Sequence, residues 1–428
     1  MAGLNKYQAY PEYRDSGVEW LGEIPRTWQA YTGKRLFSSV RTPALSNDEQ
    51  LAASQKYGVI PQTLMMQLND SKVMLALKGT DSFRHVEKNN FVISLRSFEG
   101  GIEHSNYQGC VSPAYTVLKS VNDISFSFYR YLLKSEPYIS ALQASTDSLR
   151  DGKSINYEQF GAITLPSPSL PEQSIIAHFL DHETAKIDNL IEKQQQLIEL
   201  LKEKRQAVIS HAVTKGLNPD VPMKDSGVEW LDEIPEHWRI CKLKNLAKIC
   251  NGQDYKLVQA ETGYPVIGSG GQFAWANTFL YDKPSVLLGR KGTIDKPLYI
   301  DKAFWTVDTM YYTEVFDCII EKYLYYLALT IQFNRYATNT ALPSMTQEHL
   351  GNYSFSLSFN LSEQKLIINS IEKSLIKIDA LTEKQLKQIE LLKERRTAFI
   401  SAAVTGKIDL RNWTAPIAKT EAPTEASA

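Results

Sequence analysis

The sequence predicts two α/β or α+β domains separated by two long antiparallel coiled-coil helices, with an internal pseudo-twofold repeat. Three observations predict this fold class: a short motif occurs twice, a long amphipathic segment occurs twice, and a block of unrelated sequence precedes each long segment. The chain has 428 residues. At roughly 100 to 200 residues per domain, this length accommodates about two to four domains, each with its own core.

The short motif marks the beginning of each half of the chain. Residues 15–28 read DSGVEWLGEIPRTW and residues 225–238 read DSGVEWLDEIPEHW, so that 11 of 14 positions are identical. Self-similarity of this kind indicates a duplicated structural unit. We therefore expect the two halves to share one organisation.

The long segment predicts a helix at the end of each half. Residues 172–214 and 363–405 agree at 23 of 43 positions, and both contain IELLKE. Apolar residues recur at three- and four-residue spacing between Glu, Lys and Gln, as an amphipathic helix requires. Glycine first follows at Gly216 and Gly406. At 1.5 Å per residue, each helix is about 60 Å long.

A long helix with one apolar stripe needs a partner, and the other copy has the matching pattern. We expect the copies to pack antiparallel, with Gln194 and Gln385 fixing the register. An alternative is a core helix in each of two independent domains. The predicted packing residues are Ile187, Leu190, Gln194, Leu197, Leu201, Val208, Ile378, Leu381, Gln385, Ile389, Leu392 and Phe399.

The blocks between these segments mix short β-type runs, Gly-rich turns and short helical stretches, which is typical of α/β or α+β domains. We expect a first domain over 1–168, a helix over 169–216, a second domain over 217–360 and a second helix over 361–410. Residues 411–428 are rich in Ala, Pro, Thr and Glu, and their composition predicts a disordered tail.

The composition is that of a globular protein, with 43% hydrophobic and 22% charged residues. No apolar run is long enough to span a bilayer and no secretory signal is recognisable, so we expect a cytoplasmic protein without membrane contact. The net charge of −1 means that any contact with DNA must come from local patches.

The sequence predicts no catalytic residue and no metal site. The four cysteines form no C-x-x-C pair, and His178 and His182 lack the H-E-x-x-H arrangement. Residues 152–154 read GKS, but Asp147 stands where a phosphate-binding loop requires glycine. Amino-methyltransferase motifs are also missing. A chain of this kind is expected to recognise a partner and to leave chemistry to other proteins.

This layout resembles the specificity subunit of type I restriction-modification enzymes. The resemblance covers nearly the whole chain and is carried by the repeated SGVEWL-x-EIP, by both helices with their terminal AVT, and by residues 165–173 (LPSPSLPEQ) and 361–364 (LSEQ). Turns common in the recognition domains of this family resemble GCVSPAY at 109–115, GSGG at 268–271, GRKG at 289–292 and TVDT at 306–309.

The resemblance implies a non-catalytic subunit with two target recognition domains, each reading one half of a split, asymmetric sequence in double-stranded DNA. The helices would act as a ruler for half-sites roughly 34 Å apart. It further implies two modification (adenine methyltransferase) subunits and two restriction (translocase and nuclease) subunits as partners. No cofactor is expected in this chain, since S-adenosylmethionine, ATP and Mg²⁺ belong to the partners.

In this interpretation the repeated SGVEWL segments either receive the modification subunits or seal each domain onto a helix end. Two further classes of function stay open: a fused restriction and methylation enzyme, and a coiled-coil interaction protein that does not bind DNA.

Residues that contact DNA are expected in polar turns, where Arg can read guanine, Gln can read adenine, and hydroxyls or Lys mostly contact phosphates. The candidates are Lys78, Thr80, Arg84, Arg96, Ser97, Arg150, Lys153 and Tyr157 in the first block, and Arg290, Lys291, Thr293, Ser344, Thr346 and Gln347 in the second.

Overall fold

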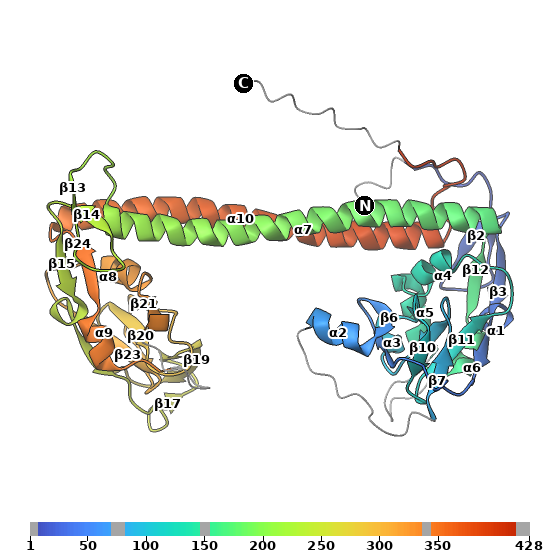
Figure 1. Ribbon diagram of the computed structural model, residues 1–428, viewed down its shortest axis with the longest axis horizontal. Coiled ribbons are helices and arrows are strands. Elements are labelled where there is room, and N and C mark those ends of the chain that lie inside the picture. Colours follow the sequence, from blue (N-terminus) through green and yellow to red (C-terminus); the bar gives the residue numbers. More distant parts are fainter. Residues whose placement is uncertain (1–6, 70–81, 146–154, 336–343, 417–428) are drawn as a thin grey trace. The chain divides into compact units, whose positions relative to one another are not determined.

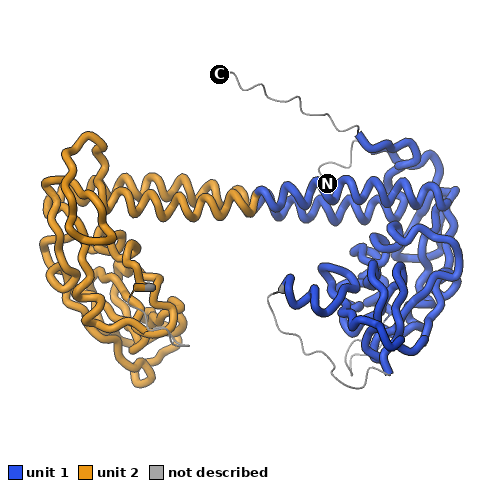
Figure 2. Tube along the Cα trace, in the orientation of Figure 1, with its two compact units in different colours: residues 1–193, 387–428 blue, residues 194–386 orange. Residues whose placement is uncertain are grey.

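The computed structural model describes residues 7–69, 82–145, 155–335 and 344–416, and its secondary structure is shown in Figure 1. The chain forms two compact units, coloured separately in Figure 2. Unit 1 comprises Met1–Lys193 and Lys387–Ala428, and unit 2 comprises Gln194–Leu386. Each unit therefore contains one variable block and a segment of each long helix.

The two long helices are α7 (Leu170–Lys215) and α10 (Leu361–Val404). Both were predicted, although the helix in the segment 361–410 ends before Leu410. The reason is Gly406, whose φ of +73° places it in the left-handed region that terminates helices; Gly216, with φ of +78°, follows α7 in the same way. Within the described part of the chain, no helix is long and apolar enough to cross a membrane.

The other elements of unit 1 are short. Its strands are β1 (Tyr13–Asp15), β2 (Glu23–Pro25), β3 (Gln29–Thr32), β4 (Phe37–Val40), β5 (Leu51–Ser54), β6 (Gly58–Pro61), β7 (Arg84–Val86), β8 (Phe91–Ile93), β9 (Glu103–His104), β10 (Gly109–Val111), β11 (Thr116–Ser120) and β12 (Thr164–Ser167). Its helices are α1 (Gly33–Leu36), α2 (Gln62–Asn69), α3 (Ser97–Gly100), α4 (Phe126–Leu132), α5 (Glu136–Ala144) and α6 (Tyr157–Ala162).

Unit 2 is built in a similar way. Its strands are β13 (Met223–Asp225), β14 (Glu233–Pro235), β15 (Arg239–Lys242), β16 (Ala247–Asn251), β17 (Gln259–Ala260), β18 (Tyr264–Gly268), β19 (Gly271–Ala276), β20 (Ser285–Gly289), β21 (Leu298–Ile300), β22 (Trp305–Thr306), β23 (Met310–Val315) and β24 (Ser354–Leu357). Its helices are α8 (Glu321–Ala328), α9 (Gln347–Asn352) and the 3₁₀ helices η2 (Leu243–Asn245) and η3 (Phe333–Arg335).

A common frame recurs in the two units. Each contains a four-stranded antiparallel sheet, ordered β4-β11-β8-β9 in unit 1 and β16-β23-β20-β21 in unit 2. The repeated motif forms the hairpins β1-β2 and β13-β14. The strand before each long helix pairs with the strand after each hairpin, as β12-β3 and β24-β15. The frame thus begins with the repeated motif and ends with the long helix.

The two units differ in the segment of chain that connects the first strand of this sheet, β4 or β16, to the third, β8 or β20. In unit 1, the chain after β4 forms the hairpin β5-β6 and helix α2, and then enters β7, which pairs with β10 outside the insert defined below. In unit 2, the chain from β16 to β20 forms β17, β18 and β19, which join β22 in a second four-stranded sheet. We call these segments the inserts, residues 41–83 and 252–284.

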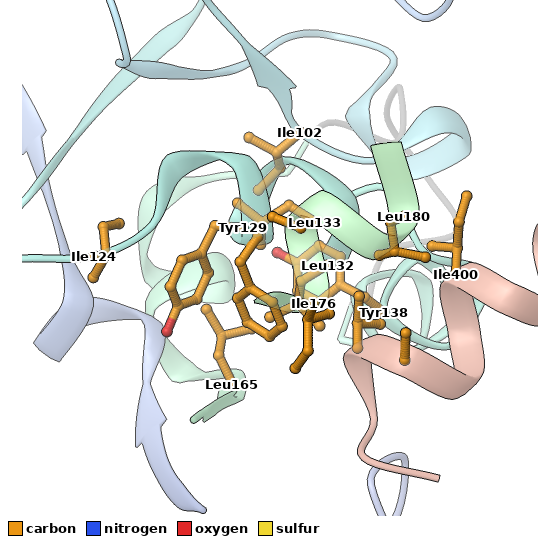
Figure 3. Packing of buried hydrophobic residues seen from close by; sticks show 14 of the residues in the cluster. Ile102, Ile124, Tyr129, Leu132, Leu133, Tyr138, Leu165, Ile176, Leu180 and Ile400 are labelled. Carbon is orange, nitrogen blue, oxygen red and sulfur yellow. The ribbon is translucent and has the colours of Figure 1, made fainter. Parts of the chain in front are cut away.

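The long helices belong to the hydrophobic cores of the units. Figure 3 shows the core of unit 1, in which Tyr129 and Leu132 of α4 pack with Ile176 and Leu180 of α7 and with Ile400 of α10. All five side chains are buried. A separate cluster in unit 2 joins α8 to both helices in the same manner. Each variable block therefore packs against the helix segments of its own unit.

Within each unit, the segments of α7 and α10 run in opposite directions. In unit 1, the Phe179 ring lies 6.0 Å from the Phe399 ring, and Arg396 Nε donates to Asp188 Oδ1 at 3.0 Å. A later residue of α7 is thus matched by an earlier residue of α10. In unit 2, Arg205 is ion-paired with Asp379.

Most of the predicted packing residues are buried or half-buried, and three are not. Leu190, Leu197 and Leu381 are 45%, 39% and 47% exposed, whereas Ile198, on the same apolar stripe, is buried. In a 3.5-residue repeat only two positions per heptad face the neighbouring helix, and these leucines occupy flanking positions. The other nine are Ile187, Gln194, Leu201, Val208, Ile378, Gln385, Ile389, Leu392 and Phe399.

Candidate nucleic-acid interface

The repeated motif fastens the first block to the long helices of unit 1. The Trp28 indole is fully buried and donates through Nε1 to Glu172 Oε1 at 3.0 Å. The Tyr10 hydroxyl donates to the same oxygen at 2.6 Å. Gly406, after α10, lies so close that an added Cβ would be 3.2 Å from the Trp28 ring. One tryptophan thus touches the start of α7 and the end of α10.

The corresponding residues of unit 2 make corresponding contacts. Trp238 is fully buried, and its Nε1 donates to Glu363 Oε1 at 3.1 Å. A Cβ on Gly216 would be 3.4 Å from the Trp238 ring. Burial raises the pKa of Glu363, but hydrogen bonds from Ser358, Trp238 and His237 together lower it by more. The net effect is a pKa below the usual value for a glutamate. The carboxylate therefore accepts the indole bond in its ionised form.

The glutamine that follows each of these glutamates ties the helix start to the block. Gln173 accepts from the Ser125 backbone N at 2.9 Å and donates to the Pro168 carbonyl at 2.9 Å. Gln364 accepts from the Ile320 backbone N at 2.9 Å and donates to the carbonyl of residue 358 at 2.8 Å. Both glutamines are buried. The EIP-x-x-W half of the motif and the Glu-Gln pair together seal each block onto its helices.

Four predicted DNA contacts of the first block, Lys78, Thr80, Arg150 and Lys153, lie outside the described residues. Arg96 is exposed at the turn after β8. Arg84 is half-buried in β7, where its guanidinium donates to the Tyr115 carbonyl and burial beside Arg41 lowers its pKa.

Two further candidates of the first block form hydrogen bonds within unit 1, and one of them is buried. Ser97 is 1% exposed, and its hydroxyl accepts from the Ser94 backbone N at 2.8 Å. The Tyr157 hydroxyl donates to the Phe37 carbonyl at 2.9 Å. Polar side chains in turns often bond to nearby backbone groups, and this competing use is not visible in the sequence.

In the second block the structure brings Arg290, Lys291 and Ser344 together. Residues 291 and 344 form an isolated β-bridge, and the Arg290 carbonyl accepts from the Met345 backbone N at 2.9 Å. The backbone N atoms of Arg290 and Lys291 both donate to the Thr309 carbonyl. Thr293 is half-buried in the same turn. Residues far apart in the sequence thus build one turn-rich edge.

The remaining candidates of the second block serve the fold. Thr346 caps α9, because its hydroxyl accepts from the His349 backbone N at 3.1 Å. Gln347 donates through Nε2 to the Ile249 carbonyl. Both side chains are nevertheless exposed, so their assignment as DNA contacts stays a prediction.

Sequence reasoning missed three residues that lie beside this edge. Ser269 belongs to the turn between β18 and β19, and Gln272 and Phe273 follow in β19. A Cβ on Gly292 would be 3.2 Å from the Ser269 hydroxyl oxygen, so the turns at 268–271 and 289–292 touch. The signal was available, since GSGG was recognised as a turn and is followed directly by an exposed amide and an exposed aromatic.

A polar cavity of about 620 Å³ lies in unit 1 between the block and its helices. Arg130 on its wall donates to Asp181 at 2.5 Å, and Lys134 donates to the buried Glu103 at 2.6 Å. Burial, helped by nearby Arg130 and Lys88, lowers the pKa of His104 from 6.5 to about 4. The Arg130–Asp181 pair links α4 to α7 at this cavity, whereas the Lys134–Glu103 pair lies within the block.

In the described ranges, no group of three or more His, Cys, Asp and Glu side chains could hold a metal ion. The four cysteines form no disulfide with one another. Two sealed blocks with exposed polar turns define a protein of the recognition class.

Comparison with protein families gives that class its identity. The family model described as type I restriction modification DNA specificity domain matches residues 25–200 and 235–391, once in each half. The chain belongs to this family, whose members are the non-catalytic specificity subunits of type I restriction-modification enzymes.

Two curated relatives illustrate the similarity. The type I restriction enzyme MjaVIII specificity subunit of Methanocaldococcus jannaschii is 24% identical over 424 residues, which cover 91% of this chain and 95% of that protein. The EcoBI specificity subunit of Escherichia coli is 35% identical over 127 residues, covering 28% of this chain and 26% of that protein.

Two solved structures share the fold. One comes from a study of complex assembly and conformational transition of the type I R-M system, with a TM-score of 0.69 and 15% identity over 90% of this chain and 99% of that one. The other is the crystal structure of the HsdS subunit from Thermoanaerobacter tengcongensis, with a TM-score of 0.53 and 14% identity over 90% of this chain and 98% of that one.

Proposed function

We propose that this specificity subunit binds a bipartite, asymmetric sequence in double-stranded DNA, with each unit reading one half. One observation carries the proposal: the two units share a frame but differ in the inserts 41–83 and 252–284. A common frame allows equivalent docking on two half-sites, and unlike inserts allow the half-sites to differ in sequence. Contacts through loops on a rigid scaffold are the usual basis of such recognition.

The long helices act as the ruler between the half-sites. We propose that they form one antiparallel coiled coil with a pseudo-twofold relation between the halves. The ion pairs Asp188–Arg396 and Asp379–Arg205 support this, because the repeat relates each residue of one pair to a residue of the other. In this proposal the domains are 1–168 and 217–360, the spacer helices lie within 169–216 and 361–410, and 411–428 is the tail.

The candidates that reach DNA in this proposal are those that the structure leaves accessible or does not describe. Arg290, Thr293 and Ser344 are half-buried and belong to the set through their place in the edge of unit 2. The set is Arg96, Arg290, Lys291, Thr293, Ser344, Thr346 and Gln347, together with Lys78, Thr80, Arg150 and Lys153.

Catalysis is carried out by partner subunits in this proposal. Two modification subunits supply adenine methylation with S-adenosylmethionine, and two restriction subunits supply ATP- and Mg²⁺-dependent translocation and cleavage. The exposed leucines on the long helices, including Leu190, Leu197 and Leu381, offer an apolar surface for such partners. The relatives are named as subunits of type I restriction enzymes, and we place the complex in the cytoplasm with its DNA.

The test is a map of methylated adenines in a methylation-free host that carries the modification subunits with or without this chain. We expect a two-part motif only when the chain is present. Replacing residues 252–284 with the corresponding insert of a relative should change one half of the motif and leave the other intact. The control replaces residues 41–83, and should alter the opposite half.

Three outcomes would contradict the proposal. Methyl transfer by the purified chain alone would favour the fused enzyme. Absence of DNA binding by the assembled complex at low salt would favour the pure interaction protein, since phosphate contacts strengthen as salt falls. A change in both half-motifs after one exchange would contradict the assignment of one unit to one half.

A further inference from the structure

Unit 2 carries a corner where two glycine turns meet. The first turn, Gly268–Gly271, joins β18 to β19, and the second, Gly289–Gly292, follows β20. The turns touch through Ser269 and Gly292. Around Gly270 and Gly271 there is open space: a Cβ added to either glycine would meet no atom within 4 Å. The corner is therefore a protruding edge whose backbone another molecule can approach closely.

Two polar side chains on this edge form no hydrogen bond or ion pair with the residues that the structure describes. Gln272 is exposed in β19, and Lys291 is exposed in the second turn. Their backbones are fixed, because residue 272 lies opposite Ile267 at a β-bulge and residue 291 is bridged to residue 344. Neighbouring Arg290 is held inward, over the Tyr311 ring and toward the Asp308 carbonyl. The edge thus presents an amide and an ammonium on a rigid support.

An exposed aromatic completes the corner. Phe273 is 54% exposed, and its ring also lies against Gly268 and edge-on to Tyr255. Ala274 and Ala276, on the opposite face of β19, pack in the core instead. The outward face of β19 therefore offers an apolar surface beside the amide and the ammonium.

This combination matches the exposed edges of base pairs in the major groove. Gln can bond bidentately to adenine, Lys can donate to the acceptors of guanine, and an aromatic side chain can contact the thymine methyl group. Phosphate contacts would require mainly cations, but the acids Asp295 and Asp308 are also exposed near the second turn. Nearly balanced charge favours reading of bases over general attraction to the backbone.

We propose that Gln272 and Lys291 are the specificity-determining residues of unit 2 and read base edges in its half-site, with Phe273 as the apolar contact. This inference rests on the proposed function, because it requires that unit 2 bind DNA. It goes further by assigning base reading to the two glycine turns. The turn after β8 in unit 1 corresponds to the turn after β20 in unit 2, and it carries the exposed Leu95 and Arg96. This turn is therefore available for contacts with DNA in unit 1 as well.

The experiment uses the full chain in complex with its modification subunits. Gln272→Ala and Lys291→Ala complexes are mapped for methylated adenines, and their binding is measured on duplexes in which each base pair of the motif is replaced in turn. We expect each variant to lose discrimination at one position of one half-motif, by about tenfold or more, and to leave the other half unchanged. Both side chains are exposed, so folding should be unaffected.

Matched controls come from the same unit. Lys302→Ala removes an exposed lysine just after β21, whose Ile300 pairs with the first residue of β20. Gln259→Ala removes an exposed glutamine of β17, which pairs with the last residue of β19. Both should leave the motif unchanged.

The inference is overturned if Gln272→Ala and Lys291→Ala methylate the unaltered motif. It is also overturned for Lys291 if binding weakens equally on all sequences and the salt dependence falls, since that identifies a phosphate contact. A wild-type complex that yields no two-part motif would instead contradict the proposed function itself.

Discussion

The two units share one frame of strands and helices and differ in the inserts that this frame carries. In both, a buried tryptophan, a glutamate and a buried glutamine seal the block onto α7 and α10. Unit 1 inserts a hairpin and α2, whereas unit 2 inserts three strands that build a second sheet. The contacts between the block and the long helices are thus alike in the two units, and the inserts differ. Recognition can therefore change without disturbing the attachment to the helices.

The units also differ where the block meets the helices. Unit 1 buries Glu103 against Lys134 beside a low-pKa His104, whereas unit 2 pairs Lys322 with Glu372 at a more exposed place. Burial raises the pKa of Glu103 despite the nearby lysine. We therefore expect the contact between block and helices to depend more strongly on pH in unit 1 than in unit 2.

The largest expected effect comes from removing the shared tryptophan. Trp28→Ala should destabilise unit 1, and Trp238→Ala unit 2, each by about 3–5 kcal/mol, because a large buried ring leaves a cavity and an unpaired glutamate. Urea unfolding monitored by probes in each unit measures both. Trp275→Ala, at an exposed ring, is the control. Very different losses for Trp28 and Trp238 would break the equivalence of the frames.

Acid should separate the units next. His104 is neutral in the folded chain down to a pKa of about 4, whereas the unfolded chain takes up its proton near 6.5. The free energy of unfolding of unit 1 should therefore be intact above pH 6.5 and decline by up to about 3 kcal/mol as the pH falls to 4. Stability of each unit against pH is the measurement. His104→Gln should flatten the curve, and an unchanged curve would refute the assignment.

The glutamates that accept the indole bonds should differ modestly. Glu172→Gln should cost unit 1 about 1–3 kcal/mol, since a neutral amide oxygen accepts the buried bonds from Tyr10 and Trp28 more weakly than a carboxylate oxygen does. Glu363→Gln should cost unit 2 less, because this side chain is partly exposed. Thermal unfolding of the two variants tests the order. Equal losses would show that burial does not decide the strength of the seal.

The smallest effect is expected from the helix ion pairs. Asp188–Arg396 and Asp379–Arg205 are both substantially exposed, so each should contribute less than about 1 kcal/mol. Double-mutant cycles with alanine should give similar coupling energies for the two pairs. A strong coupling in one pair alone would argue against a symmetric role in the helix pairing.

Sequence reasoning found the frame because repeats and periodicity report directly on it. The helices, their partnership within each unit and the repeated motif followed from matched residues and from three- and four-residue spacing. The same periodicity could not separate Leu197 from Ile198, since both lie near the apolar stripe. Only the position within the heptad decides which of them faces the partner.

The candidate interface was harder to predict, because a polar residue in a turn has two competing uses. Ser97, Tyr157, Thr346 and Gln347 bond to backbone groups, although they have the chemistry of DNA contacts. Gln272 was overlooked because its exposure depends on how β19 pairs across a bulge. These distinctions arise from tertiary contacts that no local pattern contains.

The two ends of the described chain hold each other in unit 1. The Asp409 backbone N donates to the Gln8 carbonyl at 2.7 Å, and the Tyr13 hydroxyl donates to the Gly406 carbonyl at 3.0 Å. Arg411 lies over the Tyr10 ring. In unit 2, the backbone from Gly216 to Met223 connects the end of a long helix to the first hairpin. In unit 1, this clasp makes the corresponding connection through noncovalent contacts. A pair of fluorophores near the two termini would therefore report opening of this clasp without altering Gln272 or Lys291.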